Sequence, residues 1–275
     1  MNGMLLEIKN LTVAFDGRGG SVEAVCGVSL TVPAGQTVAL VGESGSGKSV
    51  TAMSILRLVP QPPARFVGGE IFFRDPPSGQ TVDLLQLDAK EIRKVRGRRI
   101  AMIFQEPMTA LNPVMRVGRQ IGEVLELHRG LSGGECRAEV SLLLKRVGIS
   151  DAARRADDYP HQFSGGMRQR VMIAMALAGD PALLIADEPT TALDVTIQRQ
   201  IIGLLRDVQQ ERGMGILLIT HDFSVVSAMA DHVYVMQQGR VVEEGPVDRV
   251  MKRAREVYTQ SLLQSAMRLT GLGVG

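Results

Sequence analysis

Residues 42–49 read Gly-Glu-Ser-Gly-Ser-Gly-Lys-Ser and match the phosphate-binding pattern G-x-x-x-x-G-K-[ST] without a mismatch. Glycines let a backbone turn tightly enough for several N–H groups to converge on one anion. Lys48 adds a positive charge for the β- and γ-phosphates, and the Ser49 hydroxyl can ligate Mg²⁺. The stretch therefore predicts a nucleotide phosphate site.

The residues on either side of this loop support the same interpretation. The apolar, β-rich run 37–41 precedes it and predicts a buried strand. Residues 50–58 follow it and carry apolar side chains at roughly helical spacing, which predicts a helix whose N-terminus faces the phosphates. A glycine-rich turn with no ligand would not require this strand–loop–helix context.

A second apolar run, residues 183–186, ends in two adjacent acids, Asp187 and Glu188. In a nucleotide site the first acid can hold Mg²⁺ and the second can polarise the attacking water. Many strands end in an acid at a turn, so the pair gains its meaning from the phosphate-binding pattern in the same chain.

A Ser-Gly-Gly turn at residues 164–166 opens a long apolar stretch, and the free N–H groups at such a helix start could bind a γ-phosphate. Three further polar residues stand near the ends of apolar runs or at a turn: Gln105, Asp194 and His221.

In this order the motifs resemble those of the nucleotide-binding subunits of ABC transporters, over about residues 5–265. The resemblance identifies Walker A (42–49), the Q-loop (Gln105), the signature (164–169), Walker B (183–187, then Glu188), the D-loop (Asp194) and the switch histidine (His221). Segments 104–113, 159–174 and 186–196 are also similar to the oligopeptide, dipeptide and nickel importer branch, including its glutathione-import members.

The resemblance implies an α/β fold of the P-loop NTPase class, with a RecA-like parallel sheet and flanking helices. An antiparallel β-subdomain and an inserted α-helical subdomain would complete it. We expect one ATP-binding domain at 1–250, with the helical subdomain at about 110–163, and a C-terminal helical tail at 251–275. Strand-like runs at 5–8, 11–15 and 28–32 agree with the β-subdomain.

The resemblance also assigns roles to residues. It implies contacts with ATP from Phe15, Gly42, Glu43, Ser44, Gly45, Ser46, Gly47, Lys48, Ser49, Ser164, Gly165, Gly166, Gln169 and Asp194. Catalytic roles fall to Glu188, His221, Lys48 and Gln105, and Mg²⁺ would be held by Ser49, Gln105 and Asp187. Phe15 would stack on adenine, although a phenylalanine there can equally be ordinary core.

The function implied is that of an ATPase powering an importer, most simply for small peptides, with ATP and Mg²⁺ as cofactors. Partners would be a second ATP-binding subunit (the same or different), two transmembrane permease subunits and, indirectly, an extracytoplasmic substrate-binding protein. The protein would work at the cytoplasmic face of the inner (plasma) membrane, as a peripheral subunit. Nickel import remains an alternative, because cargo is chosen by other chains.

A non-transport ABC ATPase, acting in DNA repair or translation, is the more distant alternative. Repair types insert a long coiled coil between Q-loop and signature, and the roughly 60 residues between Gln105 and Ser164 are too few for one. Translation types carry two cassettes in one chain, and a non-catalytic regulator would lack the acid at Glu188.

Residues 131–135, Leu-Ser-Gly-Gly-Glu, spell the commonest form of the signature but lie too far before Walker B. Ser132 and Glu135 instead fit a capping box for a helix through Val140, Leu143 and Leu144. We therefore assign the signature to Ser164.

Charge and cysteine content argue against a nucleic-acid-binding protein and against an iron–sulfur protein. A net charge of +2 gives no general drive toward nucleic acid, and the basic run 93–99 is interpreted as a solvated helix face. The two cysteines, Cys26 and Cys136, have no metal-ligand spacing, and no cysteine follows Cys136, so we expect no iron–sulfur cluster. The start at residues 1–8 is strand-like rather than a secretory signal.

Two segments extend the resemblance to the importer branch. Residues 104–113 are the expected docking surface for a permease, with Met108 and Leu111 exposed. Residues 256–263 resemble the tail motif of the branch, with Val257 in place of its usual proline.

Overall fold

The computed structural model describes residues 3–17, 19–106, 110–191 and 193–269 of the 275-residue chain. Its contacts divide the chain into two compact units. The first comprises Met1–Ile92 and Gly215–Gly275, and the second comprises Arg93–Met214. The chain therefore leaves the first unit and later returns to it.

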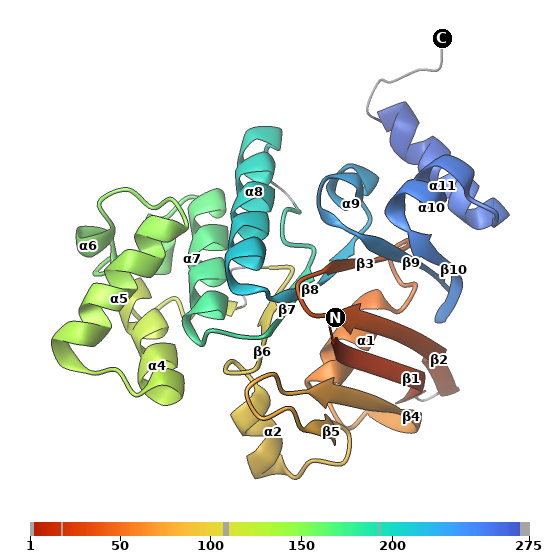
Figure 1. Ribbon diagram of the computed structural model, residues 1–275, viewed down its shortest axis with the longest axis horizontal. Helices are drawn as coiled ribbons and strands as arrows, with labels where there is room; N and C mark the ends of the chain where they lie inside the picture. Colours follow the sequence, from red (N-terminus) through yellow and green to blue (C-terminus); the bar gives the residue numbers. More distant parts are fainter. Residues whose placement is uncertain (1–2, 18, 107–109, 192, 270–275) are drawn as a thin grey trace. The chain divides into compact units, whose positions relative to one another are not determined.

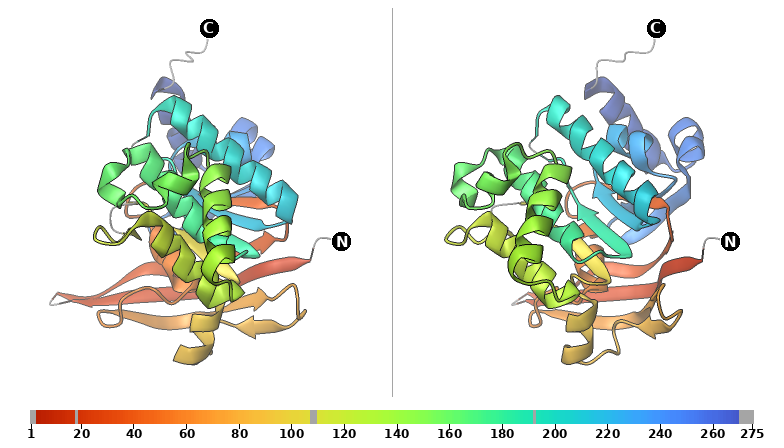
Figure 2. Two further views of the ribbon diagram at one scale, coloured as in Figure 1. Left: turned by 90° about the vertical axis from the view of Figure 1, so that its left-hand side faces the viewer. Right: turned by 60° about the vertical axis from the view of Figure 1, so that its left-hand side comes forward.

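The first unit contains an antiparallel sheet in the order β2-β1-β4-β5 (Figures 1 and 2). Its strands are β1 (Met4–Gly17), β2 (Gly20–Pro33), β4 (Ala64–Arg74) and β5 (Thr81–Asp83). The sequence predicted two strands at 5–8 and 11–15, but β1 is one strand with irregular register near Asn10, whose φ is 49°. A β-bulge shifts the side-chain alternation by one residue, and this shift interrupts the apolar pattern.

The second sheet of this unit is built on β3 (Thr37–Val41), which pairs in parallel with β8 (Gly215–Thr220) and β9 (His232–Gln237). Strand β10 (Arg240–Pro246) is antiparallel to β9. All five residues of β3 are buried, as expected for a central parallel strand. The predicted strand 37–41 is confirmed residue for residue.

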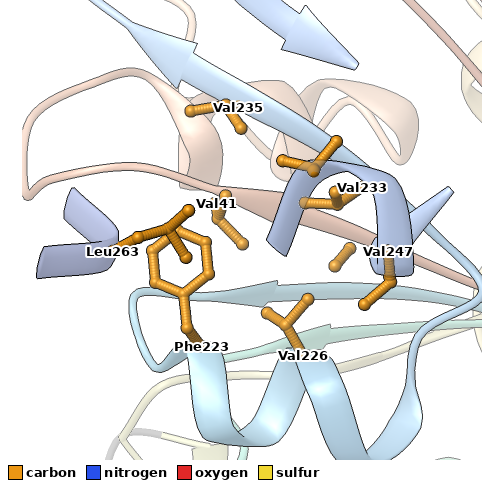
Figure 3. Packing of buried hydrophobic residues seen from close by; sticks show 9 residues of the cluster. Val41, Phe223, Val226, Val233, Val235, Val247 and Leu263 are labelled. Atoms are coloured by element: carbon orange, nitrogen blue, oxygen red, sulfur yellow. The ribbon is translucent and has the colours of Figure 1, made fainter. Parts of the chain in front are cut away.

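One hydrophobic cluster joins this sheet to three helices, α9 (Phe223–Met229), α10 (Val247–Arg253) and α11 (Val257–Leu269). Its buried members come from β3, β9 and these helices: Ala39, Val41, Phe223, Val226, Val233, Val235, Val247, Val250 and Leu263 (Figure 3). The strand residues alternate, so they share one face of the sheet, and all three helices pack on that face. Helix α1 (Lys48–Ile55) follows β3 and contacts β2 and β8.

Helix α2 (Ala89–Val95) leads from the first unit into the second. The second unit holds the parallel pair β6 (Ile100–Ile103) and β7 (Leu183–Asp187). Its helices are α4 (Val117–Arg129), α5 (Gly133–Arg146), α6 (Ala152–Arg155), α7 (Gly165–Ala178) and α8 (Val195–Arg212), with a 3-10 turn at Pro160–Gln162.

Helices α4, α5 and α7 pack against one another in this unit (Figure 1). The predicted stripe Val140, Leu143 and Leu144 is buried on α5, as helical spacing requires. The described residues between 110 and 163 contain helices and no strand, in agreement with a helical insert. The domain boundaries themselves stay a prediction.

Candidate functional site

The phosphate-binding loop lies between the end of β3 and the start of α1, where the sequence predicted it. Two of its glycines are required by close backbone approach. A Cβ atom on Gly42 would lie 2.2 Å from the Met236 carbonyl oxygen, and one on Gly47 would lie 2.4 Å from that of Ala24. Both residues also have positive φ, at 156° and 102°. A larger residue would push the loop away from β9 at Gly42 and away from β2 at Gly47.

Lys48 is the first residue of α1 and is buried, with 7% of its surface exposed. Its ammonium donates hydrogen bonds to the carbonyl oxygens of Gly42 and Glu43, each at 2.8 Å. The loop therefore wraps around a desolvated positive charge. Such a charge attracts phosphate oxygens strongly, because little water screens it.

The N-terminus of α1 lies at the end of the loop. Gly47 is its N-cap and provides no side chain to satisfy the first N–H groups of the helix. A Cβ atom added to Gly45 would meet nothing within 4 Å, so the loop leaves space beside it. A helix N-terminus beside Lys48 is suited to binding an anion, and Ser49 lies in the first turn of α1.

Two more predicted residues lie in the first unit. Phe15 is half-buried on β1, so part of its ring surface remains accessible, as a stacking role needs. His221 is exposed and stands between the end of β8 and helix α9. The adjacent Asp222 caps α9, its carboxylate accepting a hydrogen bond from the Ser224 N–H at 2.8 Å. This cap fixes the turn that carries His221.

The two predicted acids of the second unit occupy the end of β7. Asp187 and Glu188 are buried, at 5% and 9% exposure. Glu188 has a φ of 51°, in the left-handed region that residues with a Cβ seldom adopt. Such strain occurs where a fold holds one side chain in a required direction.

A residue that the sequence analysis did not single out holds the Glu188 carboxylate. The Thr191 hydroxyl donates a hydrogen bond to Glu188 Oε2 at 2.6 Å, and the Thr191 N–H donates to the Glu188 carbonyl at 3.2 Å. The only available signal was a hydroxyl residue three positions after an acid, at a turn. That signal is too common in proteins to identify a site.

Ser164 is the N-cap of α7, and its hydroxyl oxygen accepts a hydrogen bond from the Met167 N–H. Gly165 has open space around it, and Gly166 lies against Ile197 of α8, where an added Cβ atom would lie 3.0 Å from an Ile197 methyl. Asp194 caps α8 by accepting from the Ile197 N–H at 2.9 Å. The second unit thus brings the predicted signature turn and the Asp194 cap together.

Gln169 connects α7 to the turn that follows β7. It is 3% exposed, and its Nε2 donates to the Pro189 carbonyl at 2.6 Å. Pro189 directly follows Glu188, so α7 and the turn after β7 are joined by one buried hydrogen bond. The prediction that Gln169 contacts a nucleotide is not tested by this contact.

Gln105 is exposed just after β6, at the strand end where it was expected. The exposure predicted for Leu111 is wrong, because this side chain is 3% exposed. The turn around it is tied to α4: the Gln120 side chain accepts from the Asn112 N–H and donates to the carbonyls of Asn112 and Met115. This anchoring turns Leu111 inward. Met108 lies outside the described residues, and the exposed apolar side chains nearby are Phe104 and Val114.

The capping box predicted at Ser132 is also wrong, although helix α5 does begin there. Ser132 is the N-cap of α5 but makes no side-chain capping hydrogen bond. Gly133 has a φ of 55°, so the first turn of α5 starts in a left-handed conformation. That conformation does not present the N–H groups of the first turn to the Ser132 hydroxyl.

The predicted site residues are therefore divided between the two units. The first unit carries Phe15, residues 42–49 and His221, and the second carries Gln105, Ser164–Gly166, Gln169, Asp187, Glu188 and Asp194. Among the residues that the structure describes, no helix combines the length and apolar character needed to cross a bilayer.

A sequence profile described as "ABC transporter" matches residues 25–191. The chain is 54% identical over 265 residues to a Brucella ovis protein provisionally named a peptide import ATP-binding protein, covering 96% of this chain and 78% of that one. It is 51% identical over 269 residues to the oligopeptide transport ATP-binding protein OppD of Bacillus subtilis, covering 98% and 74%.

Solved structures agree with the fold. The dimeric ATP-binding cassette MJ0796, bound to ADP and Pi in a post-hydrolysis state, superposes with a TM-score of 0.78 at 29% identity, covering 88% of this chain and 99% of that one. CbiO1 of Clostridium perfringens, part of the transporter complex cbiONQ, gives 0.75 at 27% identity, covering 98% and 96%. The predicted cassette fold is thereby confirmed.

Proposed function

The chain belongs to the ABC transporter family, and from this premise we propose that it is the ATP-hydrolysing subunit of an importer for small peptides. The observation that carries ATP hydrolysis is Glu188, a buried acid directly after β7 whose carboxylate is held by the Thr191 hydroxyl. The observation that carries peptide import is the likeness to relatives named for that cargo, at 51% and 54% identity.

In the proposed mechanism, ATP places its β- and γ-phosphates in the loop 42–49. The N–H groups at the start of α1 donate to phosphate oxygens, and Lys48 exchanges loop carbonyls for phosphate oxygens. The half-buried Phe15 offers its ring to the adenine. These contacts bind the nucleotide without yet favouring hydrolysis.

Hydrolysis requires a water molecule in line with the γ-phosphate. Glu188 orients this water and accepts its proton, with Thr191 fixing the direction of the carboxylate. His221 donates a hydrogen bond to the γ-phosphate, and Gln105 contributes its amide near the water. Both roles are carried over from the family onto the matching residues.

The residues present fit Mg²⁺, which prefers oxygen ligands. The Ser49 hydroxyl, the Asp187 carboxylate and the side-chain carbonyl of Gln105 would hold it, and each is an oxygen donor. When bound, Mg²⁺ supplies positive charge that offsets the charge of the phosphates.

We propose that two such chains, or this chain and a homologue, meet head to tail. Each ATP then lies between the phosphate loop of one chain and Ser164, Gly165 and Gly166 of the other. The MJ0796 cassette is dimeric in its solved structure, which supports this arrangement. The exposed, capped start of α7 and the space around Gly165 are suited to a phosphate from a partner.

ATP-driven closure and hydrolysis-driven opening of this dimer would move two permease subunits, to which an extracytoplasmic binding protein delivers cargo. The protein would work as a peripheral subunit at the cytoplasmic face of the membrane. Phe104 and Val114, 37% and 81% exposed, are the large hydrophobic side chains that the structure describes as available to a permease in segment 104–114. The repair-factor alternative is disfavoured, because helices α4 and α5 have only 13 and 14 residues.

The test is Glu188→Gln, which keeps the size of the side chain and removes its basicity. Turnover should fall by about 10²–10⁴-fold, the range for a general base. The variant should form an ATP-dependent dimer on size-exclusion chromatography. Glu135→Gln, on the exposed start of α5, is the matched control and should hydrolyse ATP normally. A Glu188→Gln chain that stays monomeric and hydrolyses ATP at the wild-type rate would contradict the proposal.

A further inference from the structure

The C-terminal helix α11 begins on a carboxylate of strand β10. Glu243 is 8% exposed, and its two oxygens accept hydrogen bonds from the N–H groups of Arg255 and Glu256, at 2.9 and 3.2 Å. Burial by itself would raise the pKa of Glu243, but the Arg255 N–H, the Thr259 side chain, the Glu256 N–H and the Arg249 charge together outweigh it and lower the pKa. An ionised carboxylate therefore holds the start of α11 at neutral pH.

The same helix packs on the strand that leads into the phosphate loop. Leu263 of α11 is 6% exposed and belongs to the buried cluster that includes Val41 and Phe223 (Figure 3). Tyr258 packs at the edge of this cluster. Val41 is the last residue of β3 and directly precedes Gly42. Helix α11 is thus attached beside the point where the loop begins.

One hydrogen bond connects α11 to the loop itself. The Tyr258 hydroxyl oxygen accepts from the Glu43 N–H at 3.1 Å. The Glu43 carbonyl accepts from Lys48 Nζ at 2.8 Å, so the backbone of Glu43 is held from two sides. Burial, together with the neighbouring Glu43 carboxylate, raises the pKa of Tyr258, which keeps the phenol neutral at physiological pH.

Glu43, Ser44 and Gly45 are exposed, so this part of the loop has little packing to order it. ATP binding also draws Lys48 away from the Glu43 carbonyl, in the mechanism proposed above. After that exchange, the Tyr258 contact still holds the turn. Ordering a loop before its ligand arrives reduces the entropy lost on binding.

We propose that Tyr258 is a positioning residue of the phosphate loop, through which the C-terminal helix raises the affinity for ATP. This inference rests on the proposed function of residues 42–49 as the ATP site. It extends that function, because it assigns a role in nucleotide binding to a segment outside the nucleotide-binding motifs.

The experiment is Tyr258→Phe in the full chain, which removes the hydroxyl and keeps the ring in the cluster. The Kd for ATP, measured by calorimetry, should rise by about two- to tenfold, the range for one neutral hydrogen bond. The rate at saturating ATP should stay near the wild-type value. Hydrogen–deuterium exchange of the peptide covering residues 42–49, measured without nucleotide, should be faster than in the wild type.

Tyr234→Phe is the matched control. The Tyr234 hydroxyl also accepts a backbone N–H, that of Thr31 at 3.3 Å, in the same unit but away from the loop. This variant should lower the melting temperature while leaving the ATP Kd and the loop exchange unchanged. It separates loss of a hydrogen bond in general from loss of the one that reaches the loop.

An unchanged ATP Kd in Tyr258→Phe would overturn the inference, and so would an equal rise in both variants. If the wild-type chain itself failed to bind ATP, the proposed function would be at fault. The exchange of residues 42–49 in the nucleotide-free chains would then decide the role of Tyr258, with unchanged exchange overturning it.

Discussion

Two Ser-Gly-Gly turns in the second unit have the same letters and open helices of equal length, α5 and α7, yet they differ in their attachment. Ser164 accepts a hydrogen bond from the Met167 N–H and so caps α7 with its side chain. Ser132 makes no such bond, because Gly133 takes a left-handed conformation. The Ser132 turn, whose sequence is the commoner form of the signature motif, therefore lacks the side-chain cap that the Ser164 turn has.

The helices also differ five residues further along. On α7 this position is Gln169, which is buried and donates to the Pro189 carbonyl beside Glu188. On α5 it is Arg137, which is exposed. Through Gln169, the helix behind the Ser164 turn is joined to the residue that follows Glu188. The Ser-Gly-Gly sequence itself does not indicate whether its helix makes such a hydrogen bond.

The largest expected difference between the two turns is in ATP hydrolysis, after a bulky arginine replaces the serine of each turn. Ser164→Arg should lower ATP hydrolysis by more than roughly 100-fold, the scale for losing one group that stabilises a transition state. Ser132→Arg should leave the rate unchanged, because this serine is exposed and makes no side-chain cap. Steady-state phosphate release would measure both. An equal loss in the two variants would mean that the wrong turn was chosen as the signature.

A smaller effect should follow from the positions five residues later. Gln169→Leu leaves the Pro189 carbonyl without its buried donor, which should cost about 1–3 kcal/mol of stability. It should also reduce hydrolysis, because Pro189 adjoins Glu188. Arg137→Leu should change the unfolding free energy by less than about 0.5 kcal/mol, as expected for an exposed site.

Urea unfolding and ATP turnover would be measured on both variants. Wild-type turnover in Gln169→Leu would show that the bond between α7 and the catalytic strand does not serve catalysis. A large loss in Arg137→Leu would show that the two helices are equivalent.

The smallest difference concerns the caps. Ser164→Ala should destabilise the chain by about 0.5–2 kcal/mol, the range for losing an N-cap. Ser132→Ala should cost less than about 0.5 kcal/mol, because no side-chain hydrogen bond is lost. Chemical denaturation of the two variants side by side would distinguish them, and equal losses would contradict the difference in capping.

Features that depend on a few neighbouring residues could be predicted from the sequence. The run 37–41 and the run 183–187 are the strands β3 and β7, and Gly165 begins α7 as expected. Burial periodicity and helix-start chemistry act over a few residues, so a short segment contains what is needed to predict them. The phosphate loop is predictable for the same reason, since its glycines, lysine and serine are contiguous.

Other features depended on where distant segments meet. For these, the sequence led to a wrong prediction or to none. The sequence predicted an exposed Leu111, but Gln120 of α4 ties the turn that buries it. For the antiparallel sheet it suggested strands only before the phosphate loop, whereas β4 and β5 follow the loop in the chain and complete that sheet. An apolar residue in a turn and a strand interrupted by Gly-Gly give no local signal of their surroundings.

By itself, then, the sequence determined the order of motifs and the family to which the chain belongs, and it predicted the phosphate loop and the catalytic acid. Only the tertiary structure decided which side chains hold these groups in place. Tyr258 and Glu43 are 215 positions apart in the chain, and nothing near either residue indicates that they touch. Such contacts arise because sheets and helices bring remote segments together, and their hydrogen bonds form only after that packing is complete.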